Sequence, residues 1–427
     1  MLARTRRMGS DRLISGRVFC AICFVAFGLL VPVVSFAASL SNSTVTIDRA
    51  VELARQYNPD LAAVARELII AHGELTKASY LIPFNPEIAS EGNWRPRTNQ
   101  SNTQDWRVAL SQQIEIFGQR ALRIKAASLN LRERRLMVED RLRLLSAAVR
   151  MTFLDACRLR DQEKLMRELE ALDSRLLDAA RSRLRAGEIG QIDFNLAQVR
   201  YGESQRAVVE ARERYRLQRS SLGRLLGGAA GPEPVPAKVQ LVLPDYNLNQ
   251  LIANAMKNRP DLRAREIEVA RLETQLTLNS RLALPNIKVG AFGGHELNTE
   301  YPMGAMVGFS IPLFNRRQGE AEMITGQIAR ARDSLRAARL DVEKQVRDAY
   351  RAYQAARRSF RIYQGEVIQP ADESFNLLEQ AFLAGKIDLL RLAVAEREAF
   401  RARVRYLDAW FGANAARVSI ELATGAS

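Results

Sequence analysis

Residues 106–120 read WRVALSQQIEIFGQR, and residues 304–317 read GAMVGFSIPLFNRR. Both segments alternate larger apolar residues with polar or small ones, which is typical of a β-strand with two different faces. Both end in matching sequences, IEIFGQR at 114–120 and IPLFNRR at 311–317, and each leads into a long stretch with little proline. The chain is therefore predicted to make the same transition from strand to long helix twice.

Two further pairs of matching sequences extend the repetition along the chain. Asn58-Pro59-Asp60-Leu61 recurs as Arg259-Pro260-Asp261-Leu262, and Ala186-Gly187 recurs as Ala384-Gly385 at nearly the same spacing. Proline is well placed at the first position of a helix, so each Pro-Asp-Leu is predicted to begin one. We predict a duplicated unit, with a first repeat at 38–230, a Pro-rich linker at 231–246 and a second repeat at 247–427.

Two helical stretches of equal length lie between the strands and the Ala-Gly pairs, at 119–186 and 317–384. The first contains no proline and the second contains only Pro370. Such lengths exceed those of ordinary globular helices and predict coiled coils. Each stretch is expected to turn back near 187 or near 385 into another long helix. Leucines at heptad spacing mark the expected seam of the first: Leu165, Leu169, Leu172 and Leu176.

Four strands are predicted, at about 86–94, 106–116, 286–294 and 304–314, and strands of about 9–11 residues are long enough to cross a bilayer at a barrel tilt. Each repeat would place its apolar strand residues on one face. In the first repeat these are Trp106, Val108, Leu110, Ile114 and Ile116. In the second they are Ala305, Val307, Phe309, Ile311 and Leu313, opposite Gly304, Gly308 and Ser310.

Four strands cannot close a barrel alone, because an open sheet would leave unpaired backbone groups in lipid. Three copies would supply twelve strands, which is within the range of outer-membrane barrels. The predicted fold class is mainly α with a small β part: a trimeric 12-stranded outer-membrane β-barrel continued by a long α-helical barrel. A soluble four-stranded sheet with one buried face is the alternative.

The first 37 residues are predicted to be a secretory signal peptide. Five arginines precede an apolar run at 18–34, and Ser35-Phe36-Ala37 supplies the small residues that precede signal cleavage. A membrane anchor is the alternative, which the short run and Pro32 disfavour. Cleavage near Ala37 leaves Cys157 as the one remaining cysteine, and we expect it to be buried as a small hydrophobic residue.

The composition argues against an enzyme and against a nucleic-acid-binding protein. The formal net charge is +15, but arginines are interleaved with acidic residues along the predicted helices, and export removes nucleic acid as a partner. The two histidines, His72 and His295, lie in unrelated segments, and the sequence contains no HExxH, paired CxxC, GxSxG or phosphate-loop motif. We therefore expect no catalytic residue, no metal site and no cofactor.

The duplicated Pro-Asp-Leu helix starts, the strand exits at 114–120 and 311–319 and the two Ala-Gly turns together resemble the TolC-like outer-membrane efflux family. The strand exits look most like its cobalt-zinc-cadmium, or heavy-metal, branch. The resemblance implies a homotrimer in the lipid of the outer membrane of a Gram-negative bacterium, with most of the chain in the periplasm. It also implies a passive exit duct that a periplasmic adaptor joins to an inner-membrane pump of the resistance-nodulation-division type.

The branch implies heavy-metal cations as the substrate, and it places the linker at 231–246 in the equatorial region of the helices. Drug efflux and type I secretion are the alternatives within the family. A periplasmic coiled-coil adaptor or scaffold is the alternative outside it, although an adaptor carries one helical hairpin and this chain is predicted to carry two.

The resemblance further implies two functional regions. An aspartate often follows each tip glycine of the family by six residues, where three copies form a charged ring at the periplasmic aperture. Asp193 has this position in the first repeat, whereas Arg391 has it in the second, with Asp388 three residues earlier. An Asp193–Arg391 pair, within or between protomers, could latch the aperture, and two solvated charges are the alternative. The implied adaptor-docking tips are Ala186, Gly187, Glu188, Ala384, Gly385 and Lys386.

Overall fold

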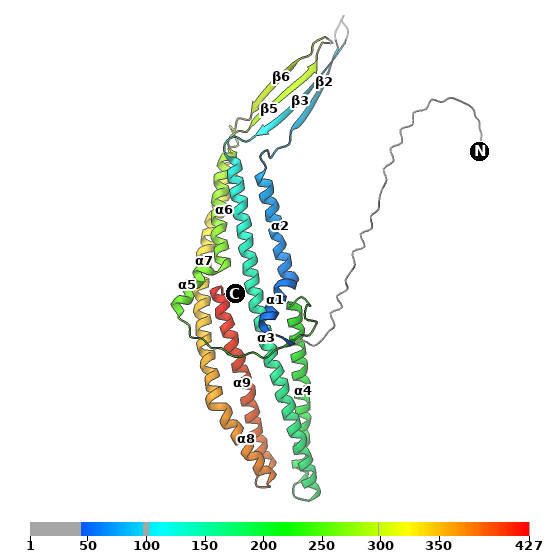
Figure 1. Cartoon of the computed structure of the whole chain (residues 1–427), viewed down its shortest axis with the longest axis vertical. Helices are drawn as coiled ribbons and strands as arrows, with labels where there is room; N and C mark the ends of the chain where they lie inside the picture. Colours follow the sequence, from blue (N-terminus) through cyan, green and yellow to red (C-terminus); the bar gives the residue numbers. More distant parts are fainter. Residues whose placement is uncertain (1–43, 97–101, 298, 427) are drawn as a thin grey trace, which may run out of the picture. The chain divides into compact units, whose positions relative to one another are not determined.

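The computed structural model describes residues 44–96, 102–297 and 299–426, and most of these residues form helices (Figure 1). The predicted signal peptide at 1–37 lies outside the described residues. Among the described residues, no helix is both long enough and apolar enough to cross a membrane.

The described elements follow the same order in both halves of the chain (Figure 1). The first half contains α1 (Ile47–Tyr57), α2 (Pro59–Ser79), β2 (Glu87–Arg95), β3 (Thr103–Ile114), α3 (Gln119–Arg185) and α4 (Gln191–Leu225). The second half contains α5 (Leu248–Asn258), α6 (Pro260–Leu282), β5 (Ile287–His295), β6 (Met303–Phe309), α7 (Gln318–Ile362), α8 (Ile368–Leu383) and α9 (Leu389–Thr424). Two short strands, β1 (Thr44–Val45) and β4 (Val235–Pro236), pair in parallel and attach the Pro-rich linker to the start of the first half.

The two long helices differ in continuity. The predicted long helix at 119–186 is confirmed as α3, which spans 67 residues without interruption. The second stretch is also helical, but a π-helical turn at Tyr363–Val367 separates α7 from α8. Pro370 explains the difference, because its missing N–H and its ring disturb the helix around Glu366, four residues earlier. A π-turn at this place accommodates the defect without ending the helical path.

In each repeat, the residue before Pro59 or Pro260 connects the second helix of the repeat to its last helix. Asn58 accepts a hydrogen bond from the backbone N–H of Leu61 at 3.0 Å, which caps α2, and its amide donates to the carbonyl of Leu225 at 3.0 Å, in the last turn of α4. One side chain thus satisfies groups at the start of one helix and at the end of another.

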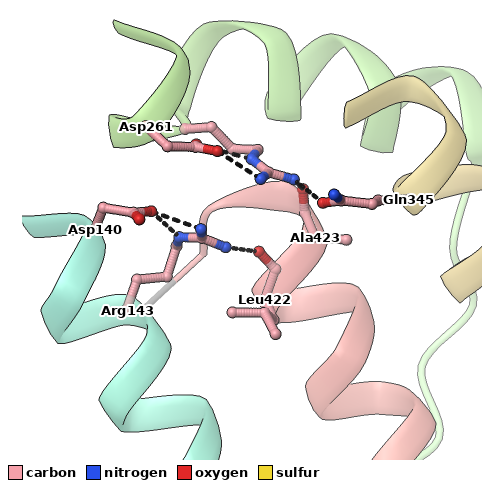
Figure 2. A network of polar contacts seen from close by, with 7 residues as sticks. Asp140, Arg143, Asp261, Gln345, Leu422 and Ala423 are labelled. Carbon is pink, nitrogen blue, oxygen red and sulfur yellow. Dashed lines mark hydrogen bonds and ion pairs between the residues drawn. The ribbon is translucent and has the colours of Figure 1, made fainter. Parts of the chain in front are cut away.

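Arg259 has the corresponding position in the second repeat, with a different chemistry. Figure 2 shows Asp261, Gln345 and Ala423 close together, with Arg143 and Leu422 beside them. Its guanidinium donates to the carbonyl of Ala423 at 3.3 Å and to the side chain of Gln345 at 2.7 Å, and it pairs with Asp261. Arg143 of α3 donates to the neighbouring carbonyl of Leu422. Two cations at the C-terminal end of α9 also interact favourably with the helix dipole.

The predicted leucine seam of α3 lies in a core that contains residues of both hairpins. Leu165, Leu172 and Leu176 are buried, and Leu169 packs against the same cluster. The core also contains Ala197 of α4 and apolar residues of α8 and α9: Phe375, Phe382, Leu392, Ala399 and Phe400. The seam therefore joins α3 to the second hairpin as well as to α4.

Cys157 is buried, as predicted. Its thiol donates to the carbonyl of Ala237 in the linker at 3.3 Å, and burial raises the pKa of the thiol to about 12. The group is therefore a neutral thiol at physiological pH.

The four longer strands form one antiparallel sheet in the order β2-β3-β5-β6, in which the β3–β5 pair joins the two halves of the chain. The last strand is shorter than predicted, because β6 ends at Phe309 rather than at residue 314. Pro312 has no amide hydrogen to donate to a strand ladder, so pairing is not expected to continue through it.

Candidate functional site

The sheet presents an exposed apolar face that crosses all four strands. Leu110 of β3 lies opposite Ile88 of β2 and Ala291 of β5, and Ala291 lies opposite Ala305 of β6. These positions share one face because neighbouring strands are in register. Leu110 and Ile88 are 53% and 76% exposed. Other large exposed residues on this face are Trp94, Trp106, Val108, Ile114, Met303, Val307 and Phe309.

The opposite face of the sheet carries charged side chains, together with Phe292 and Met306. Lys288 of β5 pairs with Glu87 of β2 at 2.5 Å, and the guanidinium of Arg107 lies 4.9 Å from the ring centroid of Phe292. In a soluble protein the apolar face of a sheet is normally the covered one. Here the apolar face is open and the polar face carries ion pairs, so the sheet is built for apolar surroundings on one side and polar surroundings on the other.

The two predicted tips adopt the same left-handed helix ending. Gly187 and Gly385 have φ values of 74° and 73°, a region that glycine enters without steric cost. In each turn the following residue closes a hydrogen bond back to the last turn of the helix: the Glu188 N–H donates to the carbonyl of Arg183, and the Lys386 N–H donates to that of Ala381, both at 2.9 Å. Both turns therefore form the Schellman motif.

The charges beyond the tips cap the return helices. The Gly190 N–H donates to the Asp193 carboxylate at 3.4 Å at the start of α4, and the Arg391 N–H donates to the Asp388 carboxylate at 2.8 Å at the start of α9. The capping aspartate thus stands at the third helical position in one repeat and at the cap position itself in the other. Asp388 therefore caps α9 without an aspartate at position 391.

Within the described chain, the Asp193 carboxylate and the Arg391 guanidinium do not form the ion pair that would latch a single protomer. Asp193 bonds to its own helix start, and Arg391 is exposed. A pair between protomers, and the position of Asp193, Asp388 and Arg391 at an aperture, stay predictions.

The structure places the two tips beside each other. Arg183 of α3 donates to the carbonyl of Phe382 in α8 at 2.9 Å, and its guanidinium lies 4.6 Å from the Phe382 ring centroid. A hollow of about 530 Å³ between the tips gathers several predicted site residues but neither Gly187 nor Arg391. Its charged lining residues are Arg183, Glu188, Asp193, Lys386 and Asp388.

A buried charged cluster, which sequence reasoning missed, lies in the core above the tips. Arg200 of α4 donates to Asp173 of α3 at 3.1 Å and also to Glu396 of α9. The side chains of Asp173 and Glu396 are 5% and 2% exposed. One guanidinium therefore forms ion pairs with two carboxylates from different hairpins. When all three groups are ionised, the cluster carries a net charge of −1.

The cluster changes the acidity of its carboxylates. Burial, opposed by Arg200 and assisted by the neighbouring Asp173 charge, raises the pKa of Glu396 to about 7. Burial also raises the pKa of Asp173, and the Arg200 charge opposes that rise. A proton shared within the cluster removes its excess negative charge. The available signal was a charged residue beside apolar heptad positions on each helix, among other charged residues, and it does not by itself identify partners.

Among the described residues, no group of three or more His, Cys, Asp and Glu side chains is arranged to hold a metal ion.

Comparisons with known proteins identify relatives along most of the chain. A family model described as outer membrane efflux protein matches residues 50–228 and 251–426. The cobalt-zinc-cadmium resistance protein CzcC of Cupriavidus metallidurans is 26% identical over 365 residues, which cover 85% of this chain and 85% of CzcC.

Solved structures share the fold at low sequence identity. A membrane protein from Pseudomonas aeruginosa has a TM-score of 0.76 at 17% identity, covering 89% of this chain and 90% of that chain. The outer membrane channel CmeC of Campylobacter jejuni has a TM-score of 0.75 at 14% identity, covering 89% and 85%. CusC, described as forming a transmembrane channel, has a TM-score of 0.75 at 16% identity, covering 89% and 92%.

Proposed function

The chain belongs to the outer membrane efflux protein family, and on this premise we propose that it is the outer-membrane exit duct of a tripartite efflux system. The observation that carries the proposal is the four-stranded sheet, with an exposed apolar face and a polar face that bears ion pairs. Such a sheet suits a wall between lipid and a water-filled lumen.

The open edges of the sheet support the proposed trimer. Within the described chain, β2 and β6 each pair on one side only. Unpaired strand edges are costly in lipid, so β6 of one copy would pair with β2 of the next until the barrel closes. Three copies would give a 12-stranded barrel, with the helices continuing as a tube into the periplasm of a Gram-negative bacterium.

The two Schellman turns are the proposed contacts to the rest of the system. They lie at the far ends of the long helices from the strands, and a Cβ at Gly187 or Gly385 would meet no described atom within 4 Å apart from its chain neighbours. A periplasmic adaptor would bind these turns and connect the duct to an inner-membrane pump of the resistance-nodulation-division type. The duct itself would conduct passively.

Heavy-metal cations are the proposed substrate. The support is the similarity to CzcC, whose name describes cobalt-zinc-cadmium resistance, over 85% of both chains. A wide duct needs no cation ligands of its own, since the pump would select the substrate.

Deletion of the gene tests this proposal. We expect hypersensitivity to cobalt, zinc and cadmium that the wild-type gene restores, with unchanged susceptibility to dyes and antibiotics. In fractionation, the protein should sediment with the outer membrane and migrate anomalously on gels until it is boiled. Hypersensitivity to dyes or antibiotics alone would replace the cation assignment with drug efflux, and a soluble periplasmic protein would contradict the duct.

A further inference from the structure

A second hollow, of about 570 Å³, lies among α2, α3 and α6, near the end of the helices that leads into the sheet. Its lining includes Lys77 and Tyr80 at the end of α2, Arg123 in the first turns of α3 and Arg271 of α6. Arg120 fixes this end of α2, because its guanidinium donates to the carbonyl of Ser79 at 2.9 Å. The hollow therefore has walls from three helices held together at the base of the sheet.

The lining is rich in cations. Lys77, Arg123, Arg134 and Arg271 all line the hollow, whereas Glu74 is the one acidic residue among its lining residues. Arg271 is neutralised by Glu133 at 2.7 Å. Lys77 and Arg134 form no ion pair with any described residue, and the Arg134 guanidinium contacts only the sulfur of Met137, at 3.8 Å. The Glu74 carboxylate already accepts from Asn130 at 2.5 Å.

Arg123 supplies a second and independent sign of a missing anion. One of its terminal nitrogens binds the Glu115 carboxylate. Its Nε and its other terminal nitrogen are buried without a hydrogen-bond partner within the described chain. Buried donors without an acceptor are rare because they lose water without compensation. A guanidinium fork matches the spacing of phosphate oxygens, so a phosphate group in the hollow would satisfy these donors once the Arg123 side chain turns them toward it.

The remaining walls are apolar. Ala78, Ala126 and Leu278 line the hollow beside Tyr80 and Pro83. Leu81 and Ile82, which follow Tyr80 directly, are 78% and 51% exposed. A ligand with an anionic head and an apolar body fits this combination of surfaces better than a fully polar anion does.

We propose that this pocket binds the phosphate of an anionic phospholipid, whose acyl chains lie along Leu81 and Ile82. The proposal rests on the proposed function, because strands that cross the outer membrane would place the helix ends at the level of the periplasmic headgroups. Arg123, Arg134 and Lys77 would then contact the phosphate, and Tyr80 would lie at the boundary between headgroup and acyl chain.

Binding to short-chain lipids tests the pocket directly. The purified full-length protein in a neutral detergent would be titrated calorimetrically with dihexanoyl phosphatidylglycerol, dihexanoyl phosphatidylcholine and inorganic phosphate. The pocket variant is Lys77→Gln with Arg134→Gln, since both side chains can change without breaking an ion pair. The control is Arg336→Gln with Lys344→Gln, which removes the same charges from exposed positions of α7, where each cation pairs, among the described residues, only with an exposed aspartate of its own helix.

We expect the pocket variant to lose at least about tenfold in affinity for phosphatidylglycerol, and the control to stay within about twofold of the wild type. The conservative variant Lys77→Arg with Arg134→Lys should recover most of the loss. Equal affinity in the wild type and the pocket variant would overturn the proposal. Inorganic phosphate binding as tightly as phosphatidylglycerol would also overturn it and assign the pocket to a soluble anion.

These measurements are independent of export. A protein that binds no lipid but shows normal outer-membrane fractionation and cation resistance would contradict the proposed lipid pocket and leave the proposed duct function unaffected. A protein that binds the lipid specifically but fails both fractionation and cation resistance would support the lipid pocket and contradict the duct function.

Discussion

The sheet and the hairpin core above the tips place apolar and charged side chains in opposite ways: the sheet exposes apolar residues, and the hairpin core buries charged ones. The sheet exposes large apolar residues and leaves the outer edges of β2 and β6 unpaired within the described chain. The hairpin core encloses Asp173, Arg200 and Glu396 among apolar side chains and pairs their charges within one chain, while the other terminal nitrogen of Arg200 is buried without a hydrogen-bond partner among the described residues. Under the proposed function the sheet would need lipid and further copies for completion, whereas the buried charges of the hairpin core are paired within one chain. Changes in the sheet should act on assembly, and changes in the hairpin core should act on the stability of each chain.

The largest effect is expected at Arg200. Arg200→Met leaves two buried carboxylates without a cation and should cost about 3–5 kcal/mol of unfolding free energy. Arg206→Met on the same helix removes an exposed guanidinium that pairs with Glu203 and Glu210, and its cost should be far smaller, because solvent screens exposed ion pairs. Denaturant unfolding of both variants checks the difference. Equal losses would show that the hairpins do not depend on the cluster.

The next effect is expected in the sheet. Leu110→Arg on the apolar face should cost about 2–4 kcal/mol near the bilayer midplane and reduce the yield of outer-membrane trimer. Ser111 is a poor control because it is buried at 7% exposure. Asn93→Arg is better, because Asn93 is exposed on the polar face, opposite Asp105. Trimer yield by fractionation and unboiled gels should fall for Leu110→Arg alone; equal yields would contradict the orientation of the sheet.

The stability of the hairpin core should depend on pH through Glu396. The pKa of Glu396 rises from its ordinary value of 4.5 to about 7, so the folded state binds a proton more tightly than the unfolded state. The stabilisation is complete below about pH 4.5 and is lost as the pH rises through about 7. Glu396→Gln should flatten the difference in melting temperature between pH 5 and pH 8. A wild type and variant with parallel pH profiles would exclude Glu396 as the titrating group.

The smallest effect on stability is expected at the tips. Gly187→Val and Gly385→Val have space for the side chain, but the left-handed backbone should cost about 1 kcal/mol each. The trimer should assemble normally and export should fail, because the added bulk lies where an adaptor is proposed to bind. Gly202→Val in α4 is the control, since Gly202 also has open space but no left-handed backbone. Normal cation resistance in both tip variants would contradict the proposal that the adaptor binds these turns.

Local patterns in the sequence predicted the features that depend on neighbouring residues. The alternation around Leu110 and Val307 predicted a shared strand face, and the proline-free stretch predicted the full length of α3. Pro59 and Pro260 begin their helices, and both tip glycines are left-handed, as the repeated sequences indicated.

Features that join distant segments were not predictable in the same way. Asp173 and Arg200 are separated by 27 positions, and Arg200 and Glu396 by 196, so their meeting depends on how two hairpins pack. Alignment of the repeats compared Asp193 with Arg391 by position, but the capping role had moved to Asp388. Pro370 was visible in the sequence, yet a kink, a break or a π-turn can each accommodate a proline.

The two Schellman turns match in backbone and differ in charge. Glu188 and Lys386 occupy the same position after their glycines, and each is exposed. Around the axis of the proposed trimer, the turns of successive hairpins would alternate between acidic and basic. A ring of identical partner subunits would therefore meet two kinds of turn, one acidic and one basic. Each partner subunit would need either one surface that binds both charges or two surfaces, one for each charge.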